Sequence, residues 1–172
     1  MAGASAPGSM DHLITVLPAY KYGIDPKSVK YVSFDGGGES VALLGKNADA
    51  IGTDISTISQ YVKSGQVRVL AVTSPEKIKI EGLEDTPTLK ELGLDAEFTI
   101  WRGLFGPKEM SKDAKDYWIE KLTALNDTDV WKEDLKRNGW EQDFKSGKDF
   151  EKFLGEQEVL ISDLLKALDM HK

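Results

Sequence analysis

Hydrophobic residues follow two different spacings along the first hundred residues of this chain. Short apolar runs, bounded by glycine or polar turn residues, alternate with segments in which apolar residues recur every three or four positions. The short runs favour β-strands and the recurring pattern favours α-helices. Strands are predicted at 31–34, 48–51, 67–72 and 97–105, and helices at 12–17, 39–44, 56–63 and 88–92.

Capping and breaking residues set the ends of the predicted helices. Ser9 is a suitable N-cap for the first helix, Pro18 interrupts or bends it, and Gly23 closes it. Gly45 and Gly65 are predicted to end the next two helices. The small-residue segment before Ser9 is predicted to be a loop.

The order of the elements predicts the fold class. The run at 67–72 is almost continuously apolar, which predicts burial on both faces, as in a parallel sheet. Alternating strands and helices predict a layered α/β domain over residues 1–106. Beyond Pro107 the pattern is helical almost throughout, with helices expected at 111–125, after Asp127, and from 146 to 168. Residues 107–172 are therefore expected to form a separate helical segment.

Composition and charge exclude several classes of function. The net charge of −7 argues against a nucleic-acid partner, because phosphate binding requires clustered Lys and Arg. The chain has no cysteine, which excludes disulfides, thiol nucleophiles, iron–sulfur clusters and thiolate zinc sites. His12 and His171 lie far apart in the sequence, so we expect no metal site, no catalytic residues and no cofactor. No stretch is long enough to span a bilayer, and the first residues lack the features of a signal peptide.

The segment Thr53-Asp54-Ile55-Ser56 follows a predicted strand and begins a helix. Free backbone N–H groups and the helix dipole attract small anions at such a junction, where ligands of open α/β sheets bind. Thr53 and Ser56 can donate hydrogen bonds to a carboxylate, and Asp54 can accept one from an amine or hydroxyl of a ligand. Ordinary N-capping by Asp54 or Ser56 is the alternative explanation.

Three consecutive glycines, Gly36, Gly37 and Gly38, stand between the first predicted strand and its helix. Phosphate-binding loops are also rich in glycine, but this triplet lacks the spacing of a dinucleotide fingerprint and the lysine of a P-loop. Asp35 and Glu39 flank it and would repel a polyanion. The triplet is therefore interpreted as a tight turn, and a wall of a ligand cleft is the second interpretation.

Several pieces of the chain, taken in order, resemble one known family. They are GASAPGSMDHL, YVSFDGGGESVALLGKNADA, SGQVRVLAVTSPEK, DTPTLKELGLD, FTIWRGLFGPKEMSK and a helical tail with RNGW. The chain is similar to the Bug family, the extracytoplasmic solute-binding proteins of tripartite tricarboxylate transporters. This resemblance implies a periplasmic-binding-protein type 2 fold, in which two α/β lobes close on a small organic carboxylate or amino acid. It covers the second lobe and the C-terminal tail, so the first lobe and the signal sequence are expected to be missing from this sequence.

The resemblance assigns roles to two further parts of the chain. It places Ser5, Gly8 and Ser9 in a ligand loop, whose backbone N–H groups and serine hydroxyls would hold a carboxylate. The alternative is a flexible N-terminus with an ordinary serine cap. It also places Trp101 and Arg102 where the chain crosses between lobes, and Arg102 would there meet a second carboxylate. The alternative is a surface arginine stacked on Trp101.

The sequence therefore predicts a binding protein and not an enzyme. Residues 1–106 would be the ligand-binding lobe, and residues 107–172 a helical segment that packs on the first lobe in the family. The resemblance implies an extracytoplasmic location and integral membrane transporter subunits as partners. Without a first lobe the tail would expose apolar helix faces, for which a homodimer is one expected solution. Two rival hypotheses are a small enzyme that uses the 36–38 and 53–56 loops as an anion hole, and a self-associating interaction module.

Overall fold

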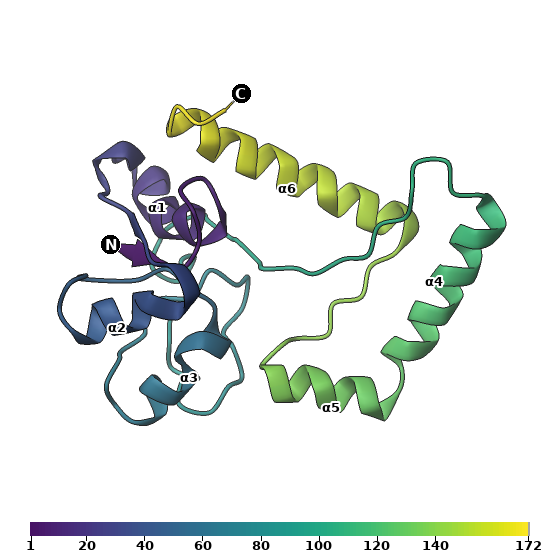
Figure 1. The fold of residues 1–172 in the computed structure, drawn as a ribbon, viewed down its shortest axis with the longest axis horizontal. Coiled ribbons are helices and arrows are strands. Elements are labelled where there is room, and N and C mark those ends of the chain that lie inside the picture. Colours follow the sequence, from purple (N-terminus) through teal and green to yellow (C-terminus); the bar gives the residue numbers. More distant parts are fainter. Residues whose placement is uncertain (172) are drawn as a thin grey trace. The chain divides into compact units, whose positions relative to one another are not determined.

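The computed structural model describes residues 1–171 of the chain and divides into two compact units (Figure 1). The first unit comprises Met1–Ile100 together with Leu160–Lys172, and the second comprises Trp101–Val159. The assignment of residues 1–106 and 107–172 to separate domains of a receptor stays a prediction.

Parallel pairing around a short central strand organises the first unit. β1 (Ala2–Gly3) pairs in parallel with β2 (Val32–Ser33), and Ala2 also forms a parallel bridge with Ile51. Ala2 donates its N–H to the carbonyl of Ala50 at 3.0 Å, and its own carbonyl accepts from the N–H of Gly52 at 3.0 Å. The strand predicted at 48–51 is therefore reduced to one bridge. β1 was not predicted, because two residues carry no periodicity.

The helices of the first unit begin and end close to where the sequence predicts. The first two are α1 (Met10–Tyr22) and α2 (Gly38–Leu44), and the third is α3 (Ile55–Lys63). Two short 3-10 helices cover Pro26–Ser28 and Asp35–Gly37. Gly23 closes α1 in the left-handed conformation at φ 85°. Pro18 lies inside α1 and does not interrupt it, which corrects one of the two predicted alternatives.

The main hydrophobic core joins α1 to the C-terminal part of α6 (Gly147–Ala167) and to the segment 89–98. α1 contributes apolar residues spaced three to four positions apart, as a helix that packs on one face requires. The buried members of this core are Leu13, Val16, Leu17, Leu89, Ala96, Phe98, Leu164 and Leu168. A smaller cluster is formed by Val72, Ile78 and Leu83.

The strand predicted at 67–72 is wrong in both its extent and its burial. Only Val72 pairs, through a parallel bridge with Thr88, and Leu70 is 61% exposed. Arg68 is also exposed, so alternate side chains of this segment face solvent. An apolar run becomes a buried strand only when neighbouring segments pair with it along its length, and here the pairing stops after one residue.

Two further predicted elements differ from the structure. Residues 88–92 form a single turn and no helix, because Thr88 is used in the bridge to Val72. A capping box closes this turn: the Thr88 N–H donates to the Glu91 carboxylate at 3.0 Å, and the Glu91 N–H donates to Thr88 Oγ1 at 3.1 Å. The strand predicted at 97–105 is also wrong, since its residues lie outside strands and bridges. Within the described chain, Phe98 is bonded to Thr73 alone: its N–H donates to the Thr73 carbonyl at 2.8 Å, and its carbonyl accepts from the Thr73 hydroxyl at 2.6 Å.

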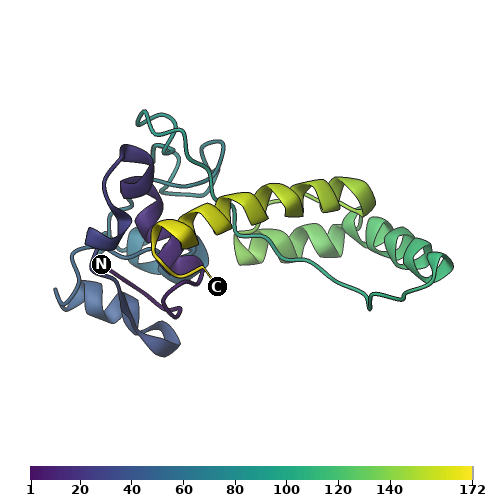
Figure 2. The same ribbon diagram turned by 90° about the horizontal axis from the view of Figure 1, so that it is seen from above.

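The second unit is helical, as the sequence predicts. α4 (Lys112–Asn126) begins after Ser111, whose Oγ accepts from the Ala114 N–H at 3.2 Å. α5 (Asp129–Asn138) is capped by Thr128 and not by the predicted Asp127. α6 is one unbroken helix, visible along its length in Figure 2.

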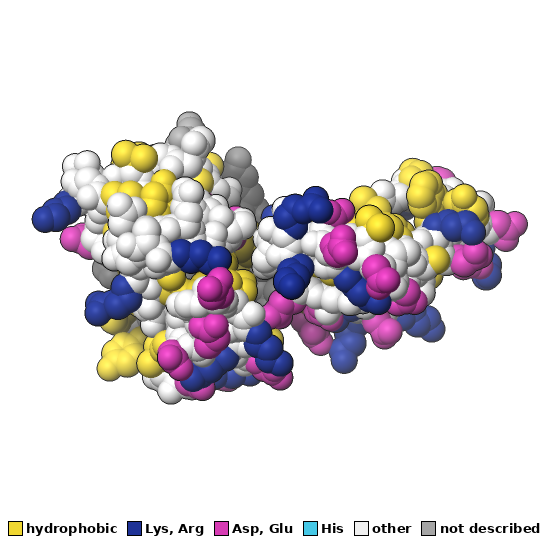
Figure 3. Space-filling view, turned by 90° about the horizontal axis from the view of Figure 1, so that it is seen from below, with side chains coloured by type: hydrophobic (Ala, Val, Ile, Leu, Met, Phe, Trp, Pro, Cys, Tyr) yellow, Lys and Arg dark blue, Asp and Glu magenta, His cyan; other side chains and the backbone are white. Residues whose placement is uncertain are grey.

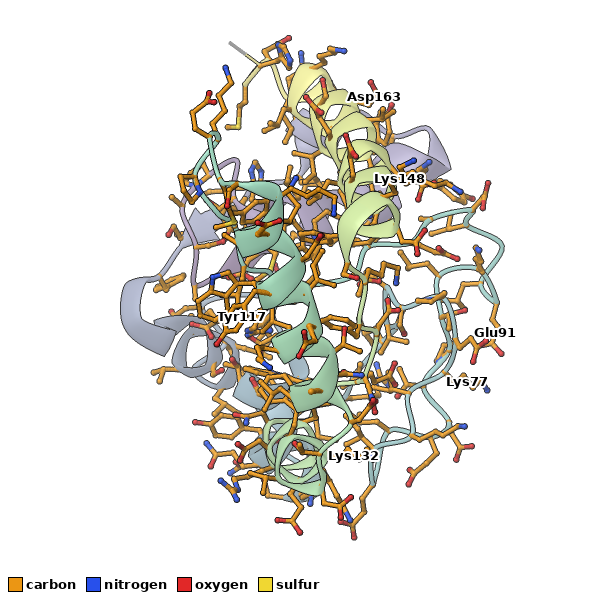
Figure 4. All side chains as sticks on the ribbon, turned by 90° about the vertical axis from the view of Figure 1, so that its right-hand side faces the viewer. Lys77, Glu91, Tyr117, Lys132, Lys148 and Asp163 are labelled. Carbon is orange, nitrogen blue, oxygen red and sulfur yellow. The ribbon has the colours of Figure 1, made fainter. Side chains whose placement is uncertain are left out.

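Charged side chains of both signs are interspersed over the surface, as Figure 3 shows for one face. Exposed ion pairs such as Lys77 with Glu91, labelled in Figure 4, join N and O atoms 3.6 Å apart. Pairs of this kind contribute little to stability because water screens them. Among the described residues, no helix combines the length and the apolar character needed to cross a bilayer.

Candidate functional site

Three strand-to-helix junctions of the first unit lie at one edge of the parallel pairing. β1 leads through 4–9 into α1, β2 leads through 34–37 into α2, and Ile51 leads through 52–54 into α3. Because β1 pairs in parallel with β2 and with Ile51, all three segments end on the same side, where ligands of open α/β sheets bind. These junctions and the first residues of the helices that follow them hold most of the predicted ligand residues: Ser5, Gly8, Ser9, Gly36, Gly37, Gly38, Thr53, Asp54 and Ser56.

The first junction is held together by the side chain of Asp11. Its Oδ2 accepts hydrogen bonds from the backbone N–H groups of Ala4 at 2.8 Å and Ser5 at 3.0 Å. In return, Ser5 Oγ accepts from the Asp11 N–H at 3.1 Å. Two of the loop N–H groups expected to hold a ligand carboxylate are therefore occupied by a carboxylate of the chain itself. The Ser5 hydroxyl keeps its proton for donation.

The end of this loop, at Gly8 and Ser9, is arranged differently. The Gly8 N–H donates to His12 Nδ1 at 2.9 Å, and Gly8 adopts φ 84°, a left-handed conformation that favours glycine. Ser9 occupies the N-cap position of α1, but its side chain makes no capping hydrogen bond. The ordinary serine cap considered from the sequence is thus not formed, and the Ser9 side chain is exposed at the helix start.

The side chains of Tyr31 and His12 form hydrogen bonds with loop 4–9. Neither residue was predicted from the sequence as part of the site. Tyr31 Oη donates to the Ser5 carbonyl at 2.8 Å. The ring centroids of Tyr31 and His12 lie 4.4 Å apart. Burial raises the pKa of Tyr31, and the charges of Asp11 and Glu39 act in the same direction. Burial lowers the pKa of His12. The only local signal for His12 is its spacing of four residues from Gly8.

The glycine triplet forms the second junction and has the geometry of a tight turn. Gly36 and Gly37 adopt left-handed conformations at φ 67° and 86°, which a residue with a Cβ rarely adopts. Gly38 begins α2, and a Cβ there would lie 3.3 Å from Cβ of Phe34. Glu39 follows and is fully buried, yet neither carboxylate oxygen has a hydrogen-bond partner among the described residues. These observations support the turn interpretation, and a role as a cleft wall stays a prediction.

The third junction is a well-formed helix cap. Asp54 Oδ1 accepts from the Thr57 N–H at 3.1 Å and also from the Ser56 hydroxyl. Asp54 therefore caps α3, as the alternative explanation held. Thr53, half-buried, makes no side-chain hydrogen bond within the described part of the chain, so its hydroxyl remains available to a ligand.

Trp101 and Arg102 belong to the second unit and have their own contacts there. Trp101 packs edge-on against Phe150 at 5.7 Å and Phe153 at 5.8 Å between centroids. The Arg102 guanidinium lies over the ring of Trp140, 4.0 Å from its centroid. Arg102 is thus a stacked cation, but on Trp140 and not on Trp101. A ligand role for either residue stays a prediction.

The chemistry of the edge suits non-covalent binding. Asp11 and Asp54 direct their charge at backbone N–H groups of their own junctions, so both are pre-organising groups. The side chains left to contact a ligand are hydroxyls, above all those of Ser9 and Thr53. Among the described residues, no group of three or more His, Asp or Glu side chains is arranged to hold a metal ion.

Comparison with protein families identifies one match over almost the whole chain. The model of the TctC family, described as the tripartite tricarboxylate transporter family receptor, matches residues 3–170. A comparison with curated proteins gave no significant match.

Two solved structures have a similar fold. One is a TctC solute-binding protein from Polaromonas, determined without ligand: it has a TM-score of 0.78, is 23% identical, and the match covers 96% of this chain and 56% of that one. The other is Rpa4515 from R. palustris with adipate: it has a TM-score of 0.75, is 20% identical, and the match covers 98% and 55% of the two chains. The chain thus spans about half the length of these neighbours. The predicted fold class, an α/β lobe of a solute-binding protein followed by a helical segment, is confirmed.

Proposed function

We propose, from the premise that this chain belongs to the TctC family of tripartite tricarboxylate transporter receptors, that its first unit is a ligand-binding lobe for a small organic carboxylate or amino acid. The observation that carries this proposal is the meeting of three strand-to-helix junctions at one edge of the parallel pairing. Hydroxyl groups and helix starts collect there, which suits a small anion.

In this proposal the ligand is held without covalent chemistry. The N-terminal ends of α1 and α3 face it with their positive dipole ends, while Ser9 and Thr53 donate hydrogen bonds to a carboxylate. The Ser5 hydroxyl is a further donor from the first loop. The solved neighbour that contains adipate makes a linear dicarboxylate the first probe to use. A complete receptor would close a second lobe over the ligand and act outside the cytoplasm with membrane transporter subunits.

Adipate is expected to bind this chain weakly, because one lobe covers only one side of a ligand. We expect a Kd in the millimolar range or weaker, equivalent to about 4 kcal/mol or less. In a ¹⁵N-labelled chain, adipate should shift the amide resonances of residues 4–9, 34–38 and 52–56 and leave those of the core unchanged. Ser9→Ala and Thr53→Val should each weaken binding severalfold by removing one donor.

Ser64→Ala is the matched control, because Ser64 lies at the opposite end of α3 and its hydroxyl donates to the Tyr61 carbonyl. It should bind adipate like the unchanged chain. Sodium chloride at equal ionic strength separates carboxylate binding from a general salt effect. The proposal is overturned if adipate shifts none of the three junctions, or shifts only lysine-rich surface segments.

We also propose that the second unit drives self-association of this chain. Several large apolar side chains of that unit are exposed: Leu104 by 73%, Phe105 by 69%, Tyr117 by 54%, Trp118 by 53% and Val130 by 70%. Tyr117 is labelled on α4 in Figure 4. Monomeric proteins rarely leave a large apolar surface uncovered.

The test is the solution mass across a range of protein concentrations. We expect the mass to rise above 19.0 kDa with concentration, and Trp118→Lys to reduce the rise by placing a charge in the contact. Leu92→Lys is the control, because Leu92 is 55% exposed but belongs to the first unit. A concentration-independent mass of one chain would exclude the homodimer.

A further inference from the structure

We propose that Asp11, His12 and Tyr31 are positioning residues that hold loop 4–9 in its ligand-binding shape, and that the Gly8–His12 hydrogen bond makes this shape sensitive to acid. The inference rests on the proposed function in one respect, namely that loop 4–9 belongs to the ligand site. The three side chains lie beneath the loop and come from α1 and from the segment before β2.

Asp11 fixes the beginning of the loop. Its carboxylate accepts two adjacent backbone N–H groups, those of Ala4 and Ser5, while its own N–H donates to Ser5 Oγ. The Asp11 residue is 5% exposed, and these hydrogen bonds are part-buried. A carboxylate that accepts backbone N–H groups makes charge-assisted hydrogen bonds, which are stronger than neutral ones. The direction of the Ser5 hydroxyl is therefore set by Asp11.

Tyr31 fixes the same residue from the other side. Its hydroxyl donates to the Ser5 carbonyl, so every backbone and side-chain polar group of Ser5 has a partner in the supporting layer. The hydroxyl also occupies the space beside Gly3, where a Cβ would lie 2.5 Å from Tyr31 Oη. This contact ties the loop to the C-terminal end of β1. Tyr31 thus links the loop, β1 and the ring of His12.

His12 fixes the end of the loop, and it can do so in only one protonation state. Its Nδ1 accepts the Gly8 N–H, which requires a lone pair on that nitrogen. The imidazolium carries a proton on both ring nitrogens and has no acceptor. When His12 is protonated, its Nδ1–H would face the Gly8 N–H, so two hydrogen-bond donors would meet. Gly8 directly precedes Ser9, the N-cap of α1. The hydrogen bond must then break and the loop must move.

The direction of the pH effect follows from burial. Burial lowers the pKa of His12 from the ordinary value of 6.5, so the unfolded or open loop binds a proton more readily than the closed loop. The stabilisation is complete above about pH 6.5 and is lost as the pH falls below it. For a single titrating group the loss cannot exceed about tenfold per pH unit.

Other ionisable groups surround Asp11, His12 and Tyr31. Tyr31 packs on the ring of His12, and Asp11 and Glu39 act on Tyr31 from α1 and α2. From the end of α6, Leu165 and Met170 approach Gly8. The ionisable side chains on that part of the chain are exposed, and they are Asp163, Lys166, Asp169 and His171. Asp169 pairs with Lys27 at 2.8 Å.

The experiment measures hydrogen exchange of the Gly8 amide and adipate affinity in the same chain at pH 7.5 and pH 5.5. Exchange is expressed as protection relative to the intrinsic rate at each pH. We expect the Gly8 protection to fall on acidification by roughly threefold or more. The adipate affinity should fall more in the unchanged chain than in His12→Asn, because the carboxylates of adipate also begin to bind protons near pH 5.5. His12→Asn keeps an acceptor oxygen near the place of Nδ1 but does not titrate. Its ratio of protection between the two pH values should stay near one.

Two further variants complete the test. His12→Ala removes the acceptor, so its Gly8 protection should be lower than that of His12→Asn at pH 7.5. His171→Asn is the control, since His171 is the other histidine and is exposed, and it should keep the acid response of the unchanged chain. Tyr31→Phe retains the ring against His12 but should weaken adipate binding severalfold by releasing the Ser5 carbonyl.

Each outcome separates this inference from the proposed function. Gly8 protection does not require a ligand, so an acid response that disappears in His12→Asn supports the inference even if adipate binds at neither pH. The inference is overturned if His12→Asn keeps the acid response, or if Gly8 protection in the unchanged chain does not depend on pH. If His12→Ala does not fold, the comparison of the unchanged chain with His12→Asn still decides the question.

Discussion

Replacing Gly52 with alanine is expected to lower the free energy of unfolding of the first unit by about 3 kcal/mol, near the upper end of the usual range for overpacking. Gly52 lies directly after the bridge between Ile51 and Ala2. A Cβ at this position would collide with Thr15 Oγ1 and would lie 2.9 Å from the Asp11 carbonyl oxygen. Because that oxygen belongs to the backbone of α1, the helix itself would have to move away.

The spectroscopic signal must be chosen for the unit in question. All four tryptophans lie in the unit Trp101–Val159, whereas four of the five tyrosines lie in the first unit. Urea unfolding followed by tyrosine near-ultraviolet circular dichroism should therefore show the loss in Gly52→Ala, and tryptophan fluorescence should not. Gly155→Ala is the control, because a Cβ there meets nothing within 4 Å. It should leave the tyrosine transition unchanged. An unchanged tyrosine transition in Gly52→Ala would contradict the close approach of α1 to Gly52.

Truncating Leu164 to alanine is expected to destabilise the first unit by about 2–5 kcal/mol, the range measured for buried leucines. Leu164 lies in the C-terminal part of α6 and is 0% exposed. It belongs to the core cluster with Leu13 and Leu17 of α1. Its removal would leave a cavity between α6 and α1, the helix that follows loop 4–9.

Val159→Ala provides the comparison for this prediction. Val159 lies five residues earlier on the same helix and is 63% exposed, so its truncation should change stability by less than about 0.5 kcal/mol. Hydrogen exchange of the α1 amides at neutral pH would measure both variants. We expect protection of α1 to fall in Leu164→Ala and to remain in Val159→Ala. Equal protection in the two variants would show that the end of α6 does not stabilise α1.

Most helices of this protein were predictable because their signals are local, although the helix predicted at 88–92 does not form. Asp54 caps α3 and Ser111 caps α4, each by accepting a backbone N–H three residues further on. Gly23 and Gly45 end α1 and α2 at the positions the sequence indicates. A cap and its helix lie within one turn of each other, so a single sequence contains all the groups involved. The α5 cap was misplaced by only one residue, from Asp127 to Thr128.

The strands were less predictable because a strand depends on a partner that is distant in the sequence. The run at 67–72 has the composition of a buried strand, yet only Val72 finds a partner, in Thr88. Residues 97–105 are as apolar and aromatic, but Trp101 packs on aromatic side chains of α6 and no strand forms. Conversely, β1 has no periodic pattern at all and is nevertheless the centre of the parallel pairing.

The helical segments and the family could be inferred from the sequence alone, as could the presence of hydroxyls, glycines and helix starts in three loops, because these are local properties. A binding role for the three loops stays a prediction. That these loops share one edge follows from the folded structure, since it depends on the pairing of β1 with β2 and Ile51. The folded structure also showed that the Asp11 carboxylate already occupies two loop N–H groups, and that His12 and Tyr31 support the loop from beneath. Such contacts depend on the direction of each side chain in the folded chain, which composition and spacing do not contain.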